Sequence, residues 1–514
     1  MMAMFRIASV FSSNMVLQRG KNVNVWGEAD NGTTITVEIN GTKAHAAAAD
    51  GKWRVVLPPM PAGGPYEMDV FSSAVKDGKE IKESIRFYNV MIGEVWLCGG
   101  QSNMELELQN CKGGKEILKE LTPECNVRFY YTPKCRMNDE ELAAAEKNSG
   151  WSEAGEQASA AWSAVGFFFA RKLAKELGVT VGLVGCNWGG TSASAWMDRE
   201  TIADSKQTVS YIEEYESAVR GKPRELQIKE YDEYMEYHTK WNERANEVYA
   251  KEPNCPWERV IELCGENKYP GPMNCKNEYR PGGLYETMLT RVCPYTLKGF
   301  LYYQGESDDH KPKSYYKLFT NMITLWRTIW EDDELPFIMV QLPMFKYEKD
   351  PDYKHWCLIR EAQMRAFKTV KNTGIAVISD CGEFNNIHPV DKVPVGERLC
   401  LQAEKLAYGM DVDAFGPIYK SAVYTEDGVE LSFDYAENGF KVKGDKLGTF
   451  EIAGADKLFR RASAEIRGDK IFVYADTVKD PKYVRFDWFN WTNVTLYGAN
   501  GIPAAPFRTS MNDE

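Results

Sequence analysis

Apolar and polar residues alternate in short runs through the first ninety residues of the chain. Residues 34–39 and 53–57 show this alternation clearly, and Asn-Gly or Asp-Gly pairs separate the runs, for example at residues 31–32 and 50–51. A period of two predicts half-buried β-strands, and these dipeptides are typical of hairpin turns. Because no helical period intervenes, residues 1–90 are predicted to form an N-terminal β-sandwich domain.

From residue 91 to about 412 the pattern changes, and apolar runs alternate with segments of helical period. Residues 160–173 place apolar side chains at helical spacing, and the strand-like run 179–184 follows directly after a glycine. Strands and helices joined by short connections predict a parallel sheet covered by helices. Residues 203–270 are rich in Glu, Lys and Tyr, and we predict an inserted pair of helices there, a lid or flank rather than a separate domain.

The alternating pattern returns after Gly416-Pro417. The strand candidates are residues 429–433, 450–452, 470–474 and 483–486. Gly, Asp and Asn bound these runs, so a second small β domain is predicted over residues 413–514. The fold class expected for the whole chain is therefore α/β, with an α/β catalytic domain over residues 91–412 flanked by two β-sandwich-like domains.

Composition narrows the classes of partner and compartment. The chain is 44% hydrophobic and 26% charged, which is ordinary for a globular protein, and its formal net charge is -12. Without a Lys/Arg cluster or a basic helix, nucleic acid and anionic membranes are not expected as partners. No apolar run approaches the roughly 18 residues of a spanning helix, and no signal-peptide pattern is visible. A cytoplasmic protein is expected, or a periplasmic or secreted one if a signal peptide has been removed.

The twelve cysteines all lie between Cys98 and Cys400, with no CxxC pair and no Cys/His grouping at zinc spacing. This distribution favours free and mostly buried thiols in a reducing compartment, with disulfide bonds in an exported enzyme as the alternative. No metal motif is present, and we expect neither a metal nor a cofactor.

Three apolar runs end in glycine followed by polar residues, at 95–104, 181–191 and 299–308. Because the carboxyl ends of parallel strands meet at one edge of a sheet, we expect these polar residues to form one site. Ser102 follows the first run, and His388, one of five histidines, follows a later apolar run that would end at the same edge. A histidine can accept the proton of a serine hydroxyl and so make the oxygen a nucleophile.

Taken alone, each of these two residues has a structural interpretation as well. The segment around Ser102 is not the G-x-S-x-G elbow of the α/β-hydrolases, because Met104 stands where the second glycine belongs. Ser102 could instead cap a helix that begins at Met104. His388, stiffened by Pro389, could be an ordinary loop histidine.

An ordered set of motifs joins the strand ends into one pattern. The motifs are Gly-Gln-Ser-Asn-Met (100–104), Gly-Gly-Thr (189–191) with Ala-Trp-Met (195–197), Tyr-Gln-Gly-Glu-Ser (303–307), Arg-Glu-Ala-Gln (360–363) and Ile-His-Pro (387–389) with Lys392. This set resembles the sialate O-acetylesterase family of carbohydrate esterases, within the SGNH hydrolase superfamily. Segments 14–19 and 503–508 resemble that family too, so the likeness spans nearly the whole chain. It implies a flavodoxin-like three-layer catalytic domain.

The resemblance also implies roles for the strand-end residues. Ser102 would be the nucleophile, and His388 the general base and later the general acid. Preorganised donors would stabilise the oxyanion formed on attack. The expected donors are the backbone N–H of Ser102, an N–H from Gly189 or Gly190, and the side-chain amide of Gln304. Gln304 is assigned from its position, because superfamily relatives often carry asparagine in this role.

Asn103, Trp188 and Glu306 are assigned to substrate binding from their places in the motifs. An aromatic face such as that of Trp188 suits a sugar ring, although strand-end aromatic residues are more often core. Glu306 has an alternative role in a structural ion pair with Arg360 beneath the site.

The third member of the triad is where the chain departs from the family pattern. Relatives often have aspartate two or three residues before the histidine, and this chain has Asn386 and Asn385 there. Neither amide carries the charge that would stabilise a protonated imidazole. Glu383 is the carboxylate that we favour, with Asp380 and Glu306 as alternatives. A Ser-His dyad oriented by a backbone carbonyl or by Asn385 stays open.

The expected function is that of a serine esterase that removes O-acetyl groups from sugars through an acetyl-serine intermediate. The resemblance implies O-acetylated sialic acid as the substrate, and acetylxylan or another acetylated plant polysaccharide is the rival. A carbohydrate-binding protein with a dead active site is the contrasting hypothesis, and only the two asparagines before the histidine favour it.

Overall fold

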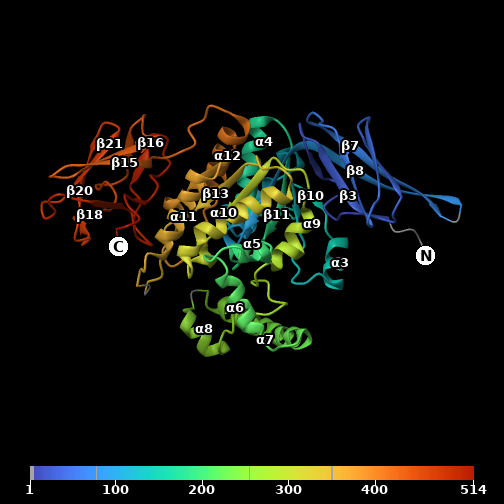
Figure 1. Cartoon of the computed structure of the whole chain (residues 1–514), viewed down its shortest axis with the longest axis horizontal. Coiled ribbons are helices and arrows are strands. Elements are labelled where there is room, and N and C mark those ends of the chain that lie inside the picture. The colour runs from blue at the N-terminus through green and yellow to red at the C-terminus, as the bar shows by residue number, and fades with distance from the viewer. Residues whose placement is uncertain (1–4, 77, 254, 349–350, 514) are drawn as a thin grey trace. The chain divides into compact units, whose positions relative to one another are not determined.

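The computed structural model describes residues 5–76, 78–253, 255–348 and 351–513 of the chain. The chain forms two compact units, whose elements are labelled in Figure 1. Unit 1 comprises Met1–Thr132, Ser149–Gly190 and Arg291–Glu514, and unit 2 comprises Pro133–Asn148 and Thr191–Thr290. All nine residues that the sequence assigns to the site lie in unit 1.

A large mixed sheet forms the centre of unit 1. In spatial order its main path is β10 (Trp151–Glu153), β9 (Val127–Tyr131), β11 (Val181–Asn187), β8 (Lys79–Gly100), β12 (Gly299–Tyr303), β13 (Phe337–Gln341) and β14 (Thr373–Val377). Every pair on this path is parallel except the edge strand β10, which runs antiparallel to β9. The predicted parallel pairing is confirmed for the strands from β9 to β14, and β8 lies between β11 and β12.

Helices cover both faces of this sheet. The helices concerned are α4 (Ala164–Leu177), α10 (Pro312–Ile329), α11 (His355–Thr369) and α12 (Val393–Tyr408). On β8, a Cβ at Gly99 would lie 2.7 Å from the ring of Trp326 on α10, whereas the Cys98 thiol lies against Gly166 of α4. Successive residues of a strand point to opposite faces, so α4 and α10 lie on opposite sides.

β8 crosses the boundary predicted at residue 90. Its first half alternates in burial, and its last nine residues are almost continuously buried. The alternation ends because one face of the first half is exposed to solvent, whereas helices cover both faces of the second half. The same sheet therefore contains N-terminal strands, so the separation of residues 1–90 as a domain stays a prediction.

The remaining N-terminal strands fall in two groups. β2 (Val16–Gln18), β4 (Thr34–Ile39), β5 (Thr42–Ala47) and β7 (Gly63–Lys76) join the large sheet, and β1 (Phe5–Ile7), β3 (Val23–Ala29) and β6 (Lys52–Leu57) form a separate three-stranded sheet.

The C-terminal residues form small antiparallel sheets around their own core. The strands are β15 (Ile418–Tyr424), β16 (Val429–Asp434), β17 (Phe440–Val442), β18 (Phe450–Ala453), β19 (Arg460–Arg461), β20 (Ser463–Arg467), β21 (Lys470–Tyr474), β22 (Tyr483–Phe486), β23 (Leu496–Gly498) and β24 (Phe507–Arg508). Val429, Ile452, Val473 and Val484 belong to one buried apolar cluster between them. Each of the four strand candidates named from the sequence lies in an observed strand.

Unit 2 is mainly helical. Its helices are α3 (Glu140–Lys147), α5 (Arg199–Ala203), α6 (Ser210–Val219), α7 (Arg224–Lys251) and α8 (Trp257–Cys264). Three of them, rather than the predicted pair, occupy the segment 203–270. Trp241 of α7 and Val260 of α8 belong to one small buried cluster.

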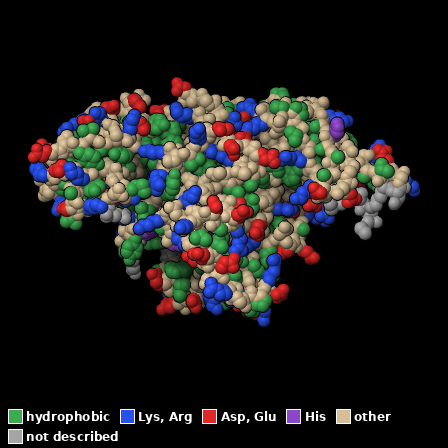
Figure 2. Space-filling model, in the orientation of Figure 1, with side chains coloured by type: hydrophobic (Ala, Val, Ile, Leu, Met, Phe, Trp, Pro, Cys, Tyr) green, Lys and Arg blue, Asp and Glu red, His purple; other side chains and the backbone are tan. Residues whose placement is uncertain are grey.

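Three short helices complete the list: α1 (Ser102–Glu105), α2 (Gly114–Glu120) and α9 (Thr290–Val292). All twelve cysteines are free. Figure 2 shows acidic and basic side chains interspersed over the visible surface. Among the described residues, no helix has the length and apolar character that crossing a membrane requires.

Candidate active site

Ser102 lies in a tight turn at the carboxyl end of β8. Gly100 ends the strand with a φ of 136°, and a Cβ there would lie 2.1 Å from the carbonyl oxygen of Tyr303. Only glycine adopts this backbone readily, so the close approach of β8 to β12 depends on it. Gln101 fixes the turn, because its N–H donates to Tyr303 O at 3.1 Å and its side-chain oxygen accepts the N–H of Ser307 at 3.1 Å.

His388 reaches the same edge from the loop after β14. Its Nε2 lies 2.8 Å from Ser102 Oγ, although 286 residues separate the two in the chain. The Asn386 side-chain oxygen accepts the His388 N–H at 3.0 Å and so shapes the loop. The structure thus brings together the serine and the histidine that the sequence predicted.

The surroundings of His388 favour a neutral imidazole. Desolvation of the ring lowers the pKa of His388, the Lys392 ammonium lowers it further, and the Glu105 carboxylate opposes them. A neutral ring can accept the proton of Ser102. Glu105 lies one helical turn after Ser102 in α1, and it is the carboxylate whose charge would favour the protonated ring.

Glu105 also connects the ends of β8 and β11. Its Oε2 accepts the N–H of Gly189 at 2.6 Å, and the Trp188 N–H donates to Gly100 O at 3.1 Å. A Cβ at Gly189 would lie 3.4 Å from Ser102 Cβ, so this glycine lies directly beside the nucleophile. Since the N–H of Gly189 is bonded to Glu105, Gly190 is left as the predicted glycine donor.

A buried network lies beneath the serine and the histidine. Both side-chain N–H bonds of Asn103 are used: one donates to Glu306 Oε1 at 2.6 Å and the other to Ile387 O at 2.9 Å. Lys392 Nζ donates to Asn103 Oδ1 at 2.6 Å. Asn103 and Lys392 are fully buried and Glu306 is 5% exposed. One amide therefore joins the nucleophile turn, the end of β12 and the histidine loop.

The buried network contains one carboxylate, Glu306, and one ammonium, Lys392, whose opposite charges stabilise each other away from water. Burial raises the pKa of Glu306, while the bond from Asn103 and the Lys392 charge oppose the rise. Burial lowers the pKa of Lys392 to about 8, and Glu306 opposes that shift. Each charged group depends on the other because neither is solvated.

Comparison with known proteins places this constellation in a family. The family model described as "Carbohydrate esterase, sialic acid-specific acetylesterase" matches residues 92–227 and 273–400, just over half of the chain. The chain belongs to this family. Ser102, Gly189, Glu306 and His388 all fall within the matched ranges, and the protein is a carboxylic ester hydrolase.

Relatives of the family match far beyond these ranges. The sialate O-acetylesterase of Mus musculus is 28% identical over 480 residues, covering 87% of this chain and 82% of that protein. The sialate O-acetylesterase of Homo sapiens is 27% identical over 556 residues, covering 99% and 93%. The crystal structure of a carbohydrate acetylesterase from Xanthomonas citri is similar with a TM-score of 0.77 and 29% identity over 98% of this chain and 99% of that chain.

Two of the three residues predicted to contact the substrate are buried beneath Ser102 and His388. Asn103 and Glu306 are bonded to each other below the surface, so their expected contact with substrate finds no support in the geometry. The ion pair between Glu306 and Arg360 is not formed, since the Arg360 guanidinium donates to the carbonyls of Pro343 and Phe489. Trp188 is half-buried beside Gly189 and stays a predicted substrate contact.

Gln304 does not fit the oxyanion role. It is 1% exposed, its Nε2 donates to Asp308 at 2.6 Å, and its side-chain oxygen accepts the Tyr315 hydroxyl at 3.1 Å. Gln304 occupies the place in the sequence where superfamily relatives often carry an oxyanion-hole asparagine. Its side chain is longer than that of asparagine and is held in a buried polar network. We assign it to support of the β12 end.

Glu383, predicted as the third member, shapes the histidine loop instead of contacting the ring. Its two oxygens accept the side-chain N–H of Asn386 at 2.9 Å and the N–H of Val390 at 2.8 Å. Asp380 is held by a bidentate pair with Arg398, and Asn385 turns to the N–H of Glu348 at 2.6 Å. The role of Glu383 in catalysis stays a prediction.

Sequence reasoning missed Glu105. The signal was its spacing, because a residue three positions after Ser102 lies on the same side of a helical turn. The described residues contain no group of three or more His, Cys, Asp or Glu side chains arranged to hold a metal.

Proposed function

We propose that this protein is a serine esterase of the SGNH type that removes O-acetyl groups from sugars through an acetyl-serine intermediate. The observation that carries the proposal is the 2.8 Å contact between Ser102 Oγ and His388 Nε2. This distance is within the reach required of a nucleophile and its base. O-acetylated sialic acid is the proposed substrate.

In the first half-reaction His388 Nε2 takes the Ser102 proton while Oγ bonds to the acetyl carbonyl carbon. The oxyanion that forms is stabilised by the N–H of Ser102, which has no intrahelical partner at the first position of α1, and by the N–H of Gly190. His388 then returns the proton to the sugar oxygen as the ester bond breaks. The sugar alcohol leaves and the acetyl group stays on Ser102.

In the second half-reaction His388 takes a proton from water, whose oxygen attacks the acetyl-serine carbonyl. The same donors stabilise the second oxyanion. The proton returns to Oγ as the bond to the acetyl carbon breaks, so acetate leaves and Ser102 is restored. His388 is protonated twice per turnover, and we propose that the nearby Glu105 charge stabilises it each time.

The proposed substrate rests on the family description and on the sialate O-acetylesterases among the relatives. A second candidate is acetylxylan or a similar plant polysaccharide, because the Xanthomonas citri relative of known structure is described only as a carbohydrate acetylesterase. Both substrates require the same attack on an acetyl carbonyl, so the geometry of Ser102 and His388 serves either.

The test is acetate release from an aryl acetate by the wild type and by Ser102→Ala. We expect the variant to lose at least about a thousandfold in kcat, and equal rates in both would overturn the esterase mechanism. A panel of O-acetylated sialic acids and acetylated xylo-oligosaccharides then compares kcat/KM between the two sugar classes. Faster turnover of the xylo-oligosaccharides would reject sialic acid as the substrate.

A further inference from the structure

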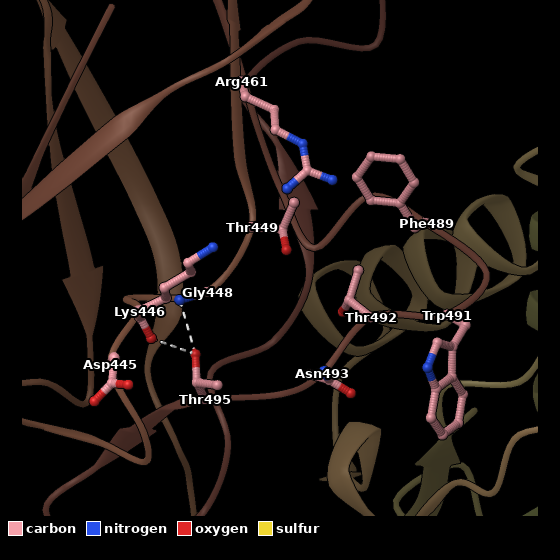
Figure 3. Close-up of a pocket in the computed structure, with 10 residues that line it drawn as sticks. All are labelled: Asp445, Lys446, Gly448, Thr449, Arg461, Phe489, Trp491, Thr492, Asn493 and Thr495. Atoms are coloured by element: carbon pink, nitrogen blue, oxygen red, sulfur yellow. Dashed lines mark hydrogen bonds between the residues drawn. The ribbon is translucent and has the colours of Figure 1, made fainter.

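A cavity of about 550 Å³ opens in the C-terminal part of unit 1 (Figure 3). Its volume falls within the range of about 300–1,000 Å³ that small-molecule sites occupy. Phe489 and Trp491 supply rings on one side, and Arg461, Thr449 and Asn493 supply polar groups around them. Aromatic faces beside hydrogen-bonding groups suit a sugar, which has apolar ring faces and polar edges.

The aromatic side of the cavity is held rigidly. Asn490, between Phe489 and Trp491, is fully buried; its backbone oxygen accepts the Phe345 N–H at 2.9 Å and its side-chain oxygen accepts the Trp356 N–H at 3.2 Å. These bonds fix the backbone position between the two rings before any ligand arrives. Preorganised rings lose little conformational entropy on binding.

Each ring also keeps a surface for a ligand. The Lys354 ammonium lies 3.5 Å from the centroid of Phe489 and covers one face of that ring. Trp491 is half-buried, and its ring plane meets that of Phe384 at an angle of 75°. Both rings line the cavity in Figure 3.

The polar side of the cavity carries excess positive charge. Arg461 and Lys446 line it against a single acid, Asp445. Among the residues that the structure describes, Arg461 forms no ion pair within 4.0 Å, whereas its neighbour Arg460 pairs with Asp456. Glu451 lies opposite Arg461 in register; burial raises the pKa of its carboxyl, and Lys354, Arg485 and Arg461 all oppose that rise, so three cations share this acid. The Arg461 guanidinium is therefore available to an anion.

The cavity connects with the histidine loop. Trp491 packs edge-on against Phe384 with ring centroids 5.5 Å apart, and Phe384 lies four residues before His388. Phe384 is 44% exposed, so an apolar surface leads from the cavity rim to that loop. The ring contact of Trp491 with Phe384 thus joins the cavity lining to the loop that carries His388.

We propose that this cavity is a second sugar-binding site, which takes a carboxylated pyranose with its ring on Trp491 and Phe489 and its carboxylate on Arg461. The shared chemistry is a sugar acid, either a nonulosonic acid or a hexuronic acid. The proposal rests on the proposed deacetylation of sugars, because it assigns the site to another residue of the same glycan.

The test is calorimetric titration of the Ser102→Ala protein with N-acetylneuraminic acid, glucuronic acid and neutral glucose. We expect one of the two acids to bind at least tenfold more tightly than glucose. Arg461→Gln and Trp491→Ala are each expected to weaken this binding at least tenfold in the Ser102→Ala background, and Arg461→Lys to recover part of it. The tighter acid identifies the class of sugar.

Two matched controls are Arg460→Gln and Trp257→Ala. Arg460 is the neighbouring arginine on β19, and Trp257 is a 51% exposed tryptophan in unit 2. Both should leave the titration unchanged. Equal affinity in Arg461→Gln, or glucose bound as tightly as the acids, would overturn the proposal. The readout is binding, so a wild type that releases no acetate from sugars would overturn only the proposed function. Arg461 is exposed, so its variants test the site even if Trp491→Ala does not fold.

Discussion

Asn103 donates a hydrogen bond to the backbone oxygen of Ile387 at 2.9 Å, which links the neighbour of the nucleophile to the neighbour of its base. Ser102 begins helix α1 and His388 lies in the loop after β14, and this bond joins the two segments. The Asn103 amide, rather than Ser102 or His388 itself, therefore positions the nucleophile and its base relative to each other.

Asn103→Ala should therefore lower kcat for an aryl acetate by about 10²-fold, since small displacements of a reacting group cost rate on this scale. KM should change little, because Asn103 is buried and does not reach the substrate. Steady-state kinetics check both values. Asn110→Ala, an exposed asparagine bonded to Glu107, is the matched control and should match the wild type. A rise in KM at constant kcat would contradict a positioning role.

Glu105→Gln should lower kcat by about 10²–10⁴-fold, the range lost when a histidine loses its carboxylate. Glu105 raises the pKa of His388, so its removal should lower that pKa. The acid limb of the pH profile of kcat/KM should then move to lower pH. In the wild type this limb should already lie below the ordinary histidine value of about 6.5.

Glu383→Gln is the control for that experiment, because Glu383 bonds to the loop and not to the ring. It should cost less rate than Glu105→Gln and leave the position of the acid limb unchanged. The opposite ranking would restore Glu383 as the third member of the triad.

Gly100→Ala should destabilise the protein strongly, because the new Cβ would lie 2.1 Å from Tyr303 O at a φ of 136°. Gly113→Ala is the comparison: Gly113 also has a positive φ, of 73°, but nothing lies within 4 Å of its Cβ position. That variant should lose only about 1–2 kcal/mol for the left-handed backbone. Thermal unfolding of both variants measures the difference, and equal losses would mean that the β8–β12 approach is not tight.

Asp487 gives a prediction about stability and pH. Burial raises the pKa of this carboxyl to about 7, against about 3.9 in an unfolded chain. The folded state holds the proton more tightly, so stability falls as the pH rises from about 4 to about 7. Asp487→Asn can keep the bond from the Thr449 N–H, which is 2.9 Å long, without the buried charge. Its unfolding midpoint should exceed that of the wild type most at pH 8 and least near pH 4.

The strand-end pattern predicted the Ser102–His388 site because glycine after an apolar run marks the end of a buried strand in any sequence. Periodicity predicted the helix within residues 160–173 and the four strand candidates of the C-terminal segment. β8 spans the boundary predicted at residue 90, because its burial changes from one face to two in mid-strand, which removes the alternation without ending the strand.

The partners of polar side chains were harder to predict. Gln304 and Asn103 occupy motif positions beside the nucleophile, and only three-dimensional packing shows that their amides are used by Asp308 and Glu306. Glu105 was missed because the search for an acid concentrated on residues near His388 in the chain. Glu105, which influences the pKa of His388, lies on the nucleophile's own helix, and its role as the acid is a proposal.

The bonds of Asn490 have a consequence for anyone who wishes to shorten this enzyme. This residue follows the C-terminal strand β22, yet it bonds to Phe345 and to Trp356 at the start of α11, and Phe489 O accepts from Arg360 in the same helix. Deleting everything after residue 412 would leave these groups unbonded in a former interior. A minimal version of the catalyst must keep the loop 487–493 or replace it with a graft that offers the same acceptors.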